Sequence, residues 1–329
     1  MSPFGMAIVV PTLELFANEF QSNYSTIQFI ISAYLFGLAI AQPFMGFLSD
    51  KFGRKPVMIS GIILFIFASY ICMTAEDLST LIIARFFQGI GASVGTVTSR
   101  AIIRDSYSGD KAAKPLSRVT GTMGMAPMIA PVVGAFALSL TGSPNGIFMV
   151  TLFIGFAILI PVLFFLPETV TKSDLEREKS VWYKNYYKLL RSEIFVGSTF
   201  IYGFTTGSFF AILAVGSTVF SKNLGIESTG FGLIWSSLTI LYASASFYAG
   251  SLTARIGLMR VLNLGVSLNL IAGFFFALLI YFTGTNIYSI ILPLSLMFLP
   301  MGLLFQCPWL KRSVIFQILL EQVLDYQAL

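Results

Sequence analysis

The sequence contains no histidine, only two cysteines and few charged residues. The lack of histidine removes the usual transition-metal ligand and the side chain that most often carries a proton near neutral pH. Cys72 and Cys307 lie far apart in apolar segments, which indicates small core residues and no disulfide framework. Charged residues make up 11% of the chain, against about 25% in soluble domains, so the composition excludes a soluble globular protein.

Long apolar segments dominate what is present, because 56% of the residues are hydrophobic. Crossing a bilayer takes about 20 apolar residues in a helix. The sequence predicts an all-α membrane protein with about ten transmembrane helices, the first of them short. These helices are expected at roughly 3–18, 25–47, 57–75, 79–101, 118–141, 146–166, 194–220, 229–251, 259–282 and 286–306.

The cations lie on one side of these predicted helices. Of the 20 Lys and Arg residues, 18 fall in alternate loops or in the C-terminal tail, while Lys222 faces the other side and Arg85 lies inside a helix. This asymmetry follows the positive-inside rule, so the +5 net charge reflects membrane topology and not binding to nucleic acid. We expect a plasma-membrane protein, in a bacterium the inner membrane, with cytoplasmic termini and lipids as its surroundings.

The longest connection divides the chain. We expect an N-terminal six-helix bundle at 1–166 and an incomplete four-helix bundle at 194–306, followed by a divergent cytoplasmic tail at 307–329. The cytoplasmic linker at 167–193 mixes aromatic residues, leucines and cations at helical spacing. This pattern predicts either an amphipathic helix on the membrane face or a solvated linker helix.

A weak internal repeat supports this division. Gly46-Phe-Leu-Ser-Asp-Lys-Phe-Gly53 and Gly250-Ser-Leu-Thr-Ala-Arg-Ile-Gly257 share two glycines, a leucine and a cation at the same offsets. Each copy follows the second helix of its half, as in transporters built from parallel repeats. Ala254 replaces the acidic residue in the second copy.

The first copy continues into the charged loop Gly46-Phe-Leu-Ser-Asp-Lys-Phe-Gly-Arg-Lys-Pro56. Gly46 and Gly53 permit close helix approach or a turn with positive φ. Asp50 suits a helix N-terminus, whose partial positive charge favours an acid. Arg54 is able to pair with carboxylates or lipid phosphates. The alternative is a generic cation-rich hairpin.

This loop resembles motif A of the major facilitator superfamily. Arg85-Phe-Phe-Gln-Gly-Ile-Gly-Ala-Ser93 resembles motif B, and Gly121-Thr-Met-Gly-Met-Ala-Pro-Met-Ile-Ala-Pro-Val-Val-Gly134 resembles the antiporter motif C. Together with Leu166-Pro-Glu-Thr169, these motifs are most similar to Bcr/CflA-type drug:proton antiporters. The resemblance implies a two-bundle major facilitator fold and a transporter, not an enzyme. It also implies that the 46–56 loop acts as a conformational switch.

A guanidinium inside a membrane helix costs about 2.5–3.5 kcal/mol on insertion scales unless it is paired or meets water. We therefore expect Arg85 to face a cavity, with Gln88 one turn on along the same face. The resemblance gives Arg85 a part in proton transfer; the alternative is a snorkelling or structurally paired arginine. With no histidine, the proton carrier is expected to be a carboxylate, and Glu14 is the candidate, unless it is a solvated interfacial acid. The sequence has no earlier acid in this first helix.

The fifth predicted helix contains Pro127 and Pro131 one turn apart, with Gly124 and Gly134 beside them. Prolines bend a helix and small residues allow close packing. The resemblance to motif C implies a gate or seal between the halves, and the alternative is a kinked packing helix without a gating role.

Arg100, Arg104 and Asp105 lie at the end of the fourth predicted helix and predict a cytoplasmic salt-bridge cluster.

We expect a small-molecule substrate and protons as ligands, with a cavity lined by Tyr34, Gln42, Tyr202, Phe209 and Trp235. The sequence shows no cofactor motif, metal-ligand spacing or nucleophile constellation. The superfamily usually has twelve helices, so helices 11 and 12 are expected to be missing and helix 1 clipped. The chain is then a monomer or needs a partner chain. Because helix 11 normally meets motif A, we predict that Asp50 pairs instead with Arg54, Arg100 or Arg104.

The predicted function is proton-coupled efflux of amphipathic small molecules, including drugs. Two alternatives remain at this point. One keeps the transporter and changes the solute to a sugar, nucleoside, siderophore or metabolite. The other is a truncated membrane protein that does not transport.

Overall fold

The computed structural model describes residues 1–107, 113–170, 190–226 and 228–304. Its regular elements are helices, because a segment surrounded by lipid has to satisfy its backbone hydrogen bonds internally. They are α1 (Ser2–Ala7), η1 (Val10–Thr12), α2 (Leu13–Glu19), α3 (Tyr24–Ile27), α4 (Phe29–Phe52), α5 (Arg54–Met73), α6 (Leu78–Ser106), α7 (Ala113–Thr141), α8 (Gly146–Phe165), α11 (Glu193–Leu224), α12 (Ser228–Ile256), α13 (Leu258–Thr283) and a further helix at Ile287–Leu304.

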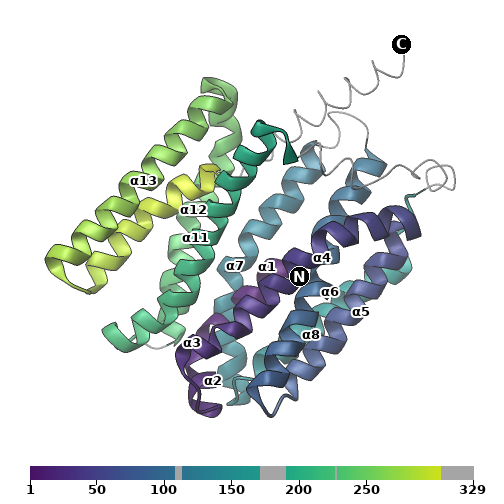
Figure 1. Ribbon diagram of the computed structural model, residues 1–329, viewed down its shortest axis with the longest axis horizontal. Coiled ribbons are helices and arrows are strands. Elements are labelled where there is room, and N and C mark those ends of the chain that lie inside the picture. The colour runs from purple at the N-terminus through teal and green to yellow at the C-terminus, as the bar shows by residue number, and fades with distance from the viewer. Residues whose placement is uncertain (108–112, 171–189, 227, 305–329) are drawn as a thin grey trace. The chain divides into compact units, whose positions relative to one another are not determined.

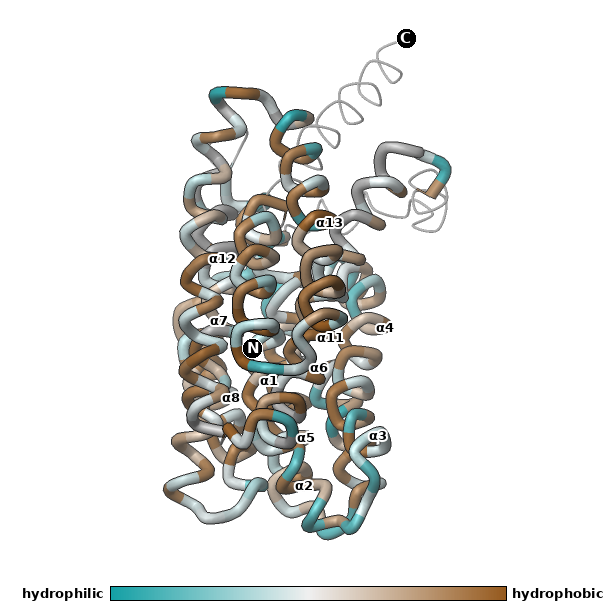
Figure 2. The backbone as a smooth tube through the Cα atoms, turned by 90° about the vertical axis from the view of Figure 1, so that its left-hand side faces the viewer, coloured by the Kyte–Doolittle hydropathy of each residue, from teal (hydrophilic) through white to brown (hydrophobic). Residues whose placement is uncertain are grey.

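Eight helices in the described ranges are long and apolar enough to cross a membrane. They confirm the predicted spans from 25–47 to 146–166 and from 229–251 to 286–306, with ends shifted by a few residues. The predicted span at 194–220 corresponds to α11, in which the described apolar stretch is Gly203–Leu213. Figure 2 shows hydrophobic helix bodies and a hydrophilic turn between α2 and α3.

The first predicted helix, 3–18, is wrong as a single span. The structure breaks it into α1, η1 and α2. Pro11 explains the break, because it has no N–H to donate and its ring clashes with the preceding helical turn. The segment is nonetheless deeply enclosed, since Ala7, Ile8 and Val9 have no exposed surface.

The chain forms two compact units, and each is described by itself. The first comprises Met1–Val181 with Gly216–Ser221 and Ile226–Ser236, and the second comprises the rest. The boundary falls inside α11 and α12. The predicted division into 1–166, 167–193, 194–306 and 307–329 stays a prediction. Most of the predicted linker helix and all of the predicted tail lie outside the described residues.

Glycines bring the helices of the first unit into backbone contact. In Figure 1, α4, α5, α6 and α8 lie side by side. A Cβ on Gly37 would overlap the carbonyl oxygen of Phe86, and one on Gly89 would overlap that of Tyr34. α4 and α6 therefore meet at a distance that only glycine permits, and this contact holds Tyr34 against the residues of α6.

In the second unit, Val261, Leu262 and Leu304 form a buried cluster between α13 and the helix at 287–304. The predicted repeat is confirmed here at the level of the backbone. Gly257, which precedes α13, has φ 87° and ψ 150°, while Gly53, which precedes α5, has φ 99° and ψ 153°. The two copies of the loop therefore make the same turn.

Candidate functional site

Gly53 joins α4 to α5 and requires a glycine for two reasons. Its φ of 99° lies where an L side chain is strained. A Cβ at this position would also lie 2.6 Å from Oε2 of Glu168. The turn therefore leaves room for a carboxylate from another part of the chain.

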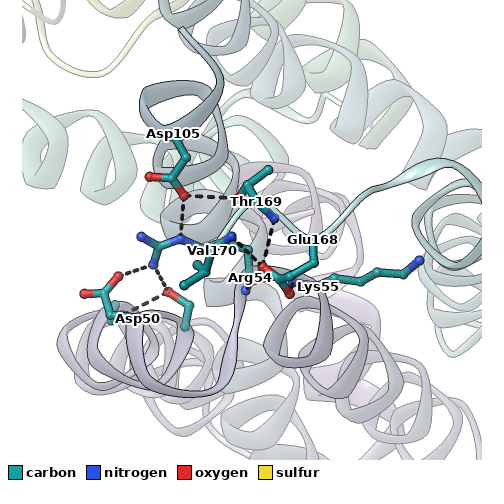
Figure 3. Close-up of polar contacts among 9 residues, drawn as sticks. Asp50, Arg54, Lys55, Asp105, Glu168, Thr169 and Val170 are labelled. Carbon is teal, nitrogen blue, oxygen red and sulfur yellow. Dashed lines mark hydrogen bonds and ion pairs between the residues drawn. The ribbon is translucent and has the colours of Figure 1, made fainter. Parts of the chain in front are cut away.

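Glu168 fills that space and caps the N-terminus of α5. Its Oε1 accepts the backbone N–H of Arg54 at 2.9 Å, and its Oε2 accepts that of Lys55 at 3.0 Å. Oε1 also accepts the N–H groups of Thr169 (2.9 Å) and Val170 (3.0 Å), and Figure 3 shows all four donors around the carboxylate. Burial alone would raise the pKa of Glu168, but these backbone donors favour the charged form, and the net shift is downward.

Arg54 links three other side chains at the same place. Nη1 pairs with Oδ1 of Asp50 and donates to Oγ of Ser49 at 2.8 Å. Nε donates to Oδ2 of Asp105 at 3.0 Å. Oγ1 of Thr169 donates to the same Asp105 oxygen at 3.1 Å (Figure 3). The end of α4, the start of α5, the end of α6 and the segment after α8 are thus joined by one polar cluster.

The predicted pairing of Asp50 with Arg54 is confirmed. The predicted salt-bridge cluster at the end of α6 is only partly right, because Asp105 pairs with Arg54 from another helix. Gly46 contributes its carbonyl oxygen, which accepts the Ser49 hydroxyl at 2.9 Å. Sequence reasoning did not assign Ser49 or Glu168 to this cluster. The only signal was the Leu-Pro-Glu-Thr run that ends α8, which gives no contact partner by itself.

The second polar site surrounds Arg85, which has no exposed surface. Nε donates to the carbonyl oxygen of Ile30 at 3.1 Å, and Nη1 donates to that of Gly5 at 2.9 Å and to Oε1 of Gln88. The Tyr34 ring lies 4.2 Å from Cζ and gives a cation–π contact. The structure therefore brings Arg85, Gln88 and Tyr34 together, as the sequence predicted for the first two.

Gln88 extends this site to two more helices. Nε2 donates to Oγ of Ser69 in α5 at 2.7 Å and to Oγ1 of Thr151 in α8 at 3.2 Å. Tyr34 Oη donates to the carbonyl oxygen of Ser2 at 2.9 Å. Sequence reasoning missed Ser69 and Thr151, because an isolated hydroxyl in an apolar helix carries no distinctive pattern.

Glu14 is not part of the Arg85 site. It lies in the first turn of α2 and is half-buried. The ion pairs between described side chains are those of Arg54, so the structure gives Glu14 no salt bridge with Arg85. Its role as a proton carrier stays a prediction.

The predicted antiporter-motif helix is α7, and Pro127, Pro131 and Gly134 are all buried in it, while Gly124 is half-buried. A Cβ on Gly134 would overlap the carbonyl oxygen of Ile8. α7 therefore packs against the backbone at the broken end of α1. This close packing fits both a seal and a plain packing helix.

The residues predicted to line a cavity fall in different environments. Tyr34 and Trp235 are buried and Gln42 is half-buried. Trp235 packs near Phe231, with ring centroids 5.9 Å apart. Phe209 is buried beside Phe298 in the second unit, with centroids 5.6 Å apart. Tyr202 belongs to α11, but its side chain lies outside the described part. A shared cavity stays a prediction.

Comparison with known proteins places these features in a family. The family model of the Major Facilitator Superfamily matches residues 1–312. The multidrug resistance protein MdtL of Escherichia coli is 33% identical over 294 residues, covering 83% of this chain and 74% of that protein. A bicyclomycin resistance protein homolog of Haemophilus influenzae is 25% identical over 274 residues, covering 83% and 69%.

Solved structures show the same fold. The inward-open xylose transporter XylE from E. coli has a TM-score of 0.72 at 14% identity, covering 94% of this chain and 79% of that chain. The human organic anion transporter MFSD10 has a TM-score of 0.61 at 16% identity, covering 91% and 74%. The helical spans, the turn at Gly53 and the family match together show that the chain belongs to the major facilitator superfamily, whose members are membrane transporters.

Proposed function

We propose that this protein is a proton-coupled exporter of amphipathic small molecules, including drugs. The observation that carries the proposal is the relationship to proteins named for multidrug and bicyclomycin resistance. The buried prolines of α7 and its close packing at Gly134 are compatible with an antiporter-type helix but do not distinguish it from a plain packing helix. Transport of another solute is the second candidate, since the fold is shared with a xylose transporter.

The polar cluster around Arg54 is proposed to act as the conformational switch. It joins the start of α5 to the ends of α4, α6 and α8 through Asp50, Asp105 and Glu168. Such a cluster holds one arrangement of the helices and breaks when they move apart. The cation distribution supports placing this face in the cytoplasm. Reporter fusions at residue 53 and residue 142 test the orientation, which is wrong if residue 142 reports a cytoplasmic position.

Glu14 is proposed to carry the proton, because no histidine is available and it is the only acid in the segment from α1 to α2 besides Glu19 at the end of α2. Arg85 and Gln88 are proposed to sense its state through the packing of α1. In this scheme Glu14→Gln abolishes exchange driven by a pH gradient. The matched control is Glu19→Gln, which removes an exposed acid one turn further along the same helix.

The function is tested by expressing the full chain in cells that lack their own drug exporters. We expect lower accumulation of at least one fluorescent amphipathic drug from a panel that includes anionic compounds, and a return to the control level when a protonophore collapses the proton gradient. Purified protein in liposomes should give drug uptake or release when a pH gradient is imposed. Accumulation equal to the empty-vector control across a compound panel would reject drug export. Transport of a sugar or metabolite by the same protein would then favour the second candidate.

A further inference from the structure

Arg85 keeps unused hydrogen-bond donors in a buried site. A guanidinium has five N–H groups. Three of them are used, since Nε meets Ile30 and Nη1 meets Gly5 and Gln88. Nη2, with the other two, has no hydrogen-bond partner among the described residues, although the whole side chain has no exposed surface. A buried donor without an acceptor is unfavourable, so Nη2 is available to bind a further acceptor.

The charge of Arg85 is also uncompensated. All three acceptors that it meets are neutral, being two backbone carbonyls and an amide. The titratable groups that act on it electrostatically are Tyr34 and Cys72, and a phenol and a thiol are ordinarily neutral at pH 7. Within the described ranges, the carboxylates that form ion pairs are those of Asp50 and Asp105, and both pair with Arg54. An uncompensated buried charge costs several kcal/mol, so the missing acceptor is expected to be an anion.

The surroundings hold the guanidinium in a fixed orientation. The rings of Tyr34 and Phe148 lie 4.2 and 5.9 Å from Cζ. Gln88 is itself held by Ser69 and Thr151 from two other helices. A donor fixed in this way binds an anionic oxygen without first losing side-chain freedom. The hydrogen bond is also charge-assisted, which makes it stronger than a neutral one.

We infer that Arg85 binds the anionic group of the transported molecule, a carboxylate, phosphate or sulfonate, through Nη2. Anion binding at Arg85 stands by itself, whereas the identification of the bound molecule as the substrate rests on the proposed function. Arg85 is enclosed in this structure, so the anionic group reaches it only when α1 separates from α6. Two contacts join these helices: the hydrogen bond from Arg85 to the carbonyl oxygen of Gly5, and a 2.8 Å hydrogen bond between Ser2 and Thr96. A cationic drug without an acidic group would be repelled at this point.

Binding is tested on the purified full chain in detergent by thermal denaturation, so the result does not depend on transport. Octanoate, octanamide and octylammonium have equal apolar tails and differ in the charge of the head group. We expect octanoate to stabilise the protein at concentrations about tenfold lower than octanamide, as a charge-assisted hydrogen bond allows. Octylammonium should stabilise it least.

Arg85→Gln should remove the preference for octanoate. Arg85→Lys keeps the charge but changes the donor geometry, so it should reduce the preference. The Lys variant provides the readout if the Gln variant does not fold. Arg255→Gln, which removes an exposed cation, should leave the preference intact. An equal response to the three probes, or a preference retained in Arg85→Gln, would overturn the inference. Sodium phosphate and sodium chloride form a separate arm. Stabilisation by either salt through Arg85, without any preference for octanoate, would show an inorganic anion site and reject the substrate assignment.

Discussion

Removing the charge of Glu168 should loosen the N-terminus of α5. The carboxylate accepts the N–H groups of Arg54 and Lys55 at 2.9 and 3.0 Å, and Gly53 has no side chain that is able to replace it. Loss of an N-cap costs about 0.5–2 kcal/mol. Glu168 is exposed to water, which weakens its charge interactions, so we expect about 1 kcal/mol for Glu168→Gln.

This change has a defined pH dependence. The pKa of Glu168 is lowered in the folded protein, so its carboxylate contributes stability above the unfolded value of about 4.3, and that contribution is lost as the pH falls through the folded value. Wild type and Glu168→Gln should therefore differ at pH 7 and converge as the pH approaches the folded pKa. Thermal denaturation in detergent, read by intrinsic tryptophan fluorescence, measures the difference.

The control is Glu76→Gln, which removes an exposed acid from the turn between α5 and α6. It should leave the denaturation temperature of the protein unchanged both at pH 7 and at a pH near the folded pKa of Glu168. Equal stability of wild type and Glu168→Gln at pH 7 would show that the cap contributes nothing. A difference that persists unchanged at low pH would show that it acts through shape and not through charge.

Three further predictions concern other contacts. Gly89→Ala should destabilise the protein by about 1–3 kcal/mol, because its Cβ would overlap the backbone of α4. Gly273→Ala is the control and should leave the stability unchanged, because the space around Gly273 is open. Thermal denaturation compares the two variants. Arg54→Lys and Asp105→Asn should each lower stability by about 0.5–1 kcal/mol, and their double variant should lose less than the sum, as a double-mutant cycle measures. Asp77→Asn should lower the denaturation temperature at neutral pH but not at low pH, because hydrogen bonds from the side chain and then the backbone of Thr80 lower the pKa of Asp77; a constant difference across pH would refute this.

Hydropathy and the positive-inside pattern predicted most of the helices, because a membrane span needs only length and apolar composition. The turn at Gly53 and the pair of Asp50 with Arg54 were also predictable, since they lie within one short segment. Their common feature is that each depends on residues close together in sequence.

The contacts that were missed join distant residues. Glu168 meets the backbone of Arg54 across 114 positions, and its place is set by the packing of α8 on α5. Arg85 meets the backbone carbonyls of Gly5 and Ile30, and any residue supplies a carbonyl, so no side-chain pattern reports the contact. The break in the first helix was foreseeable at Pro11, but hydropathy alone outweighed it in the prediction.

The long reach of Glu168 also has a consequence for biosynthesis. At about 5–20 residues per second, a ribosome needs on the order of 6–23 s to advance the 114 residues that separate Arg54 from its capping acid. During that interval α5 has entered the bilayer with its first N–H groups unsatisfied by the protein, and water at the membrane surface has to solvate them. This end of the first unit is therefore completed only after α8 has been synthesised, and a chain halted before that point would leave the N-terminus of α5 uncapped.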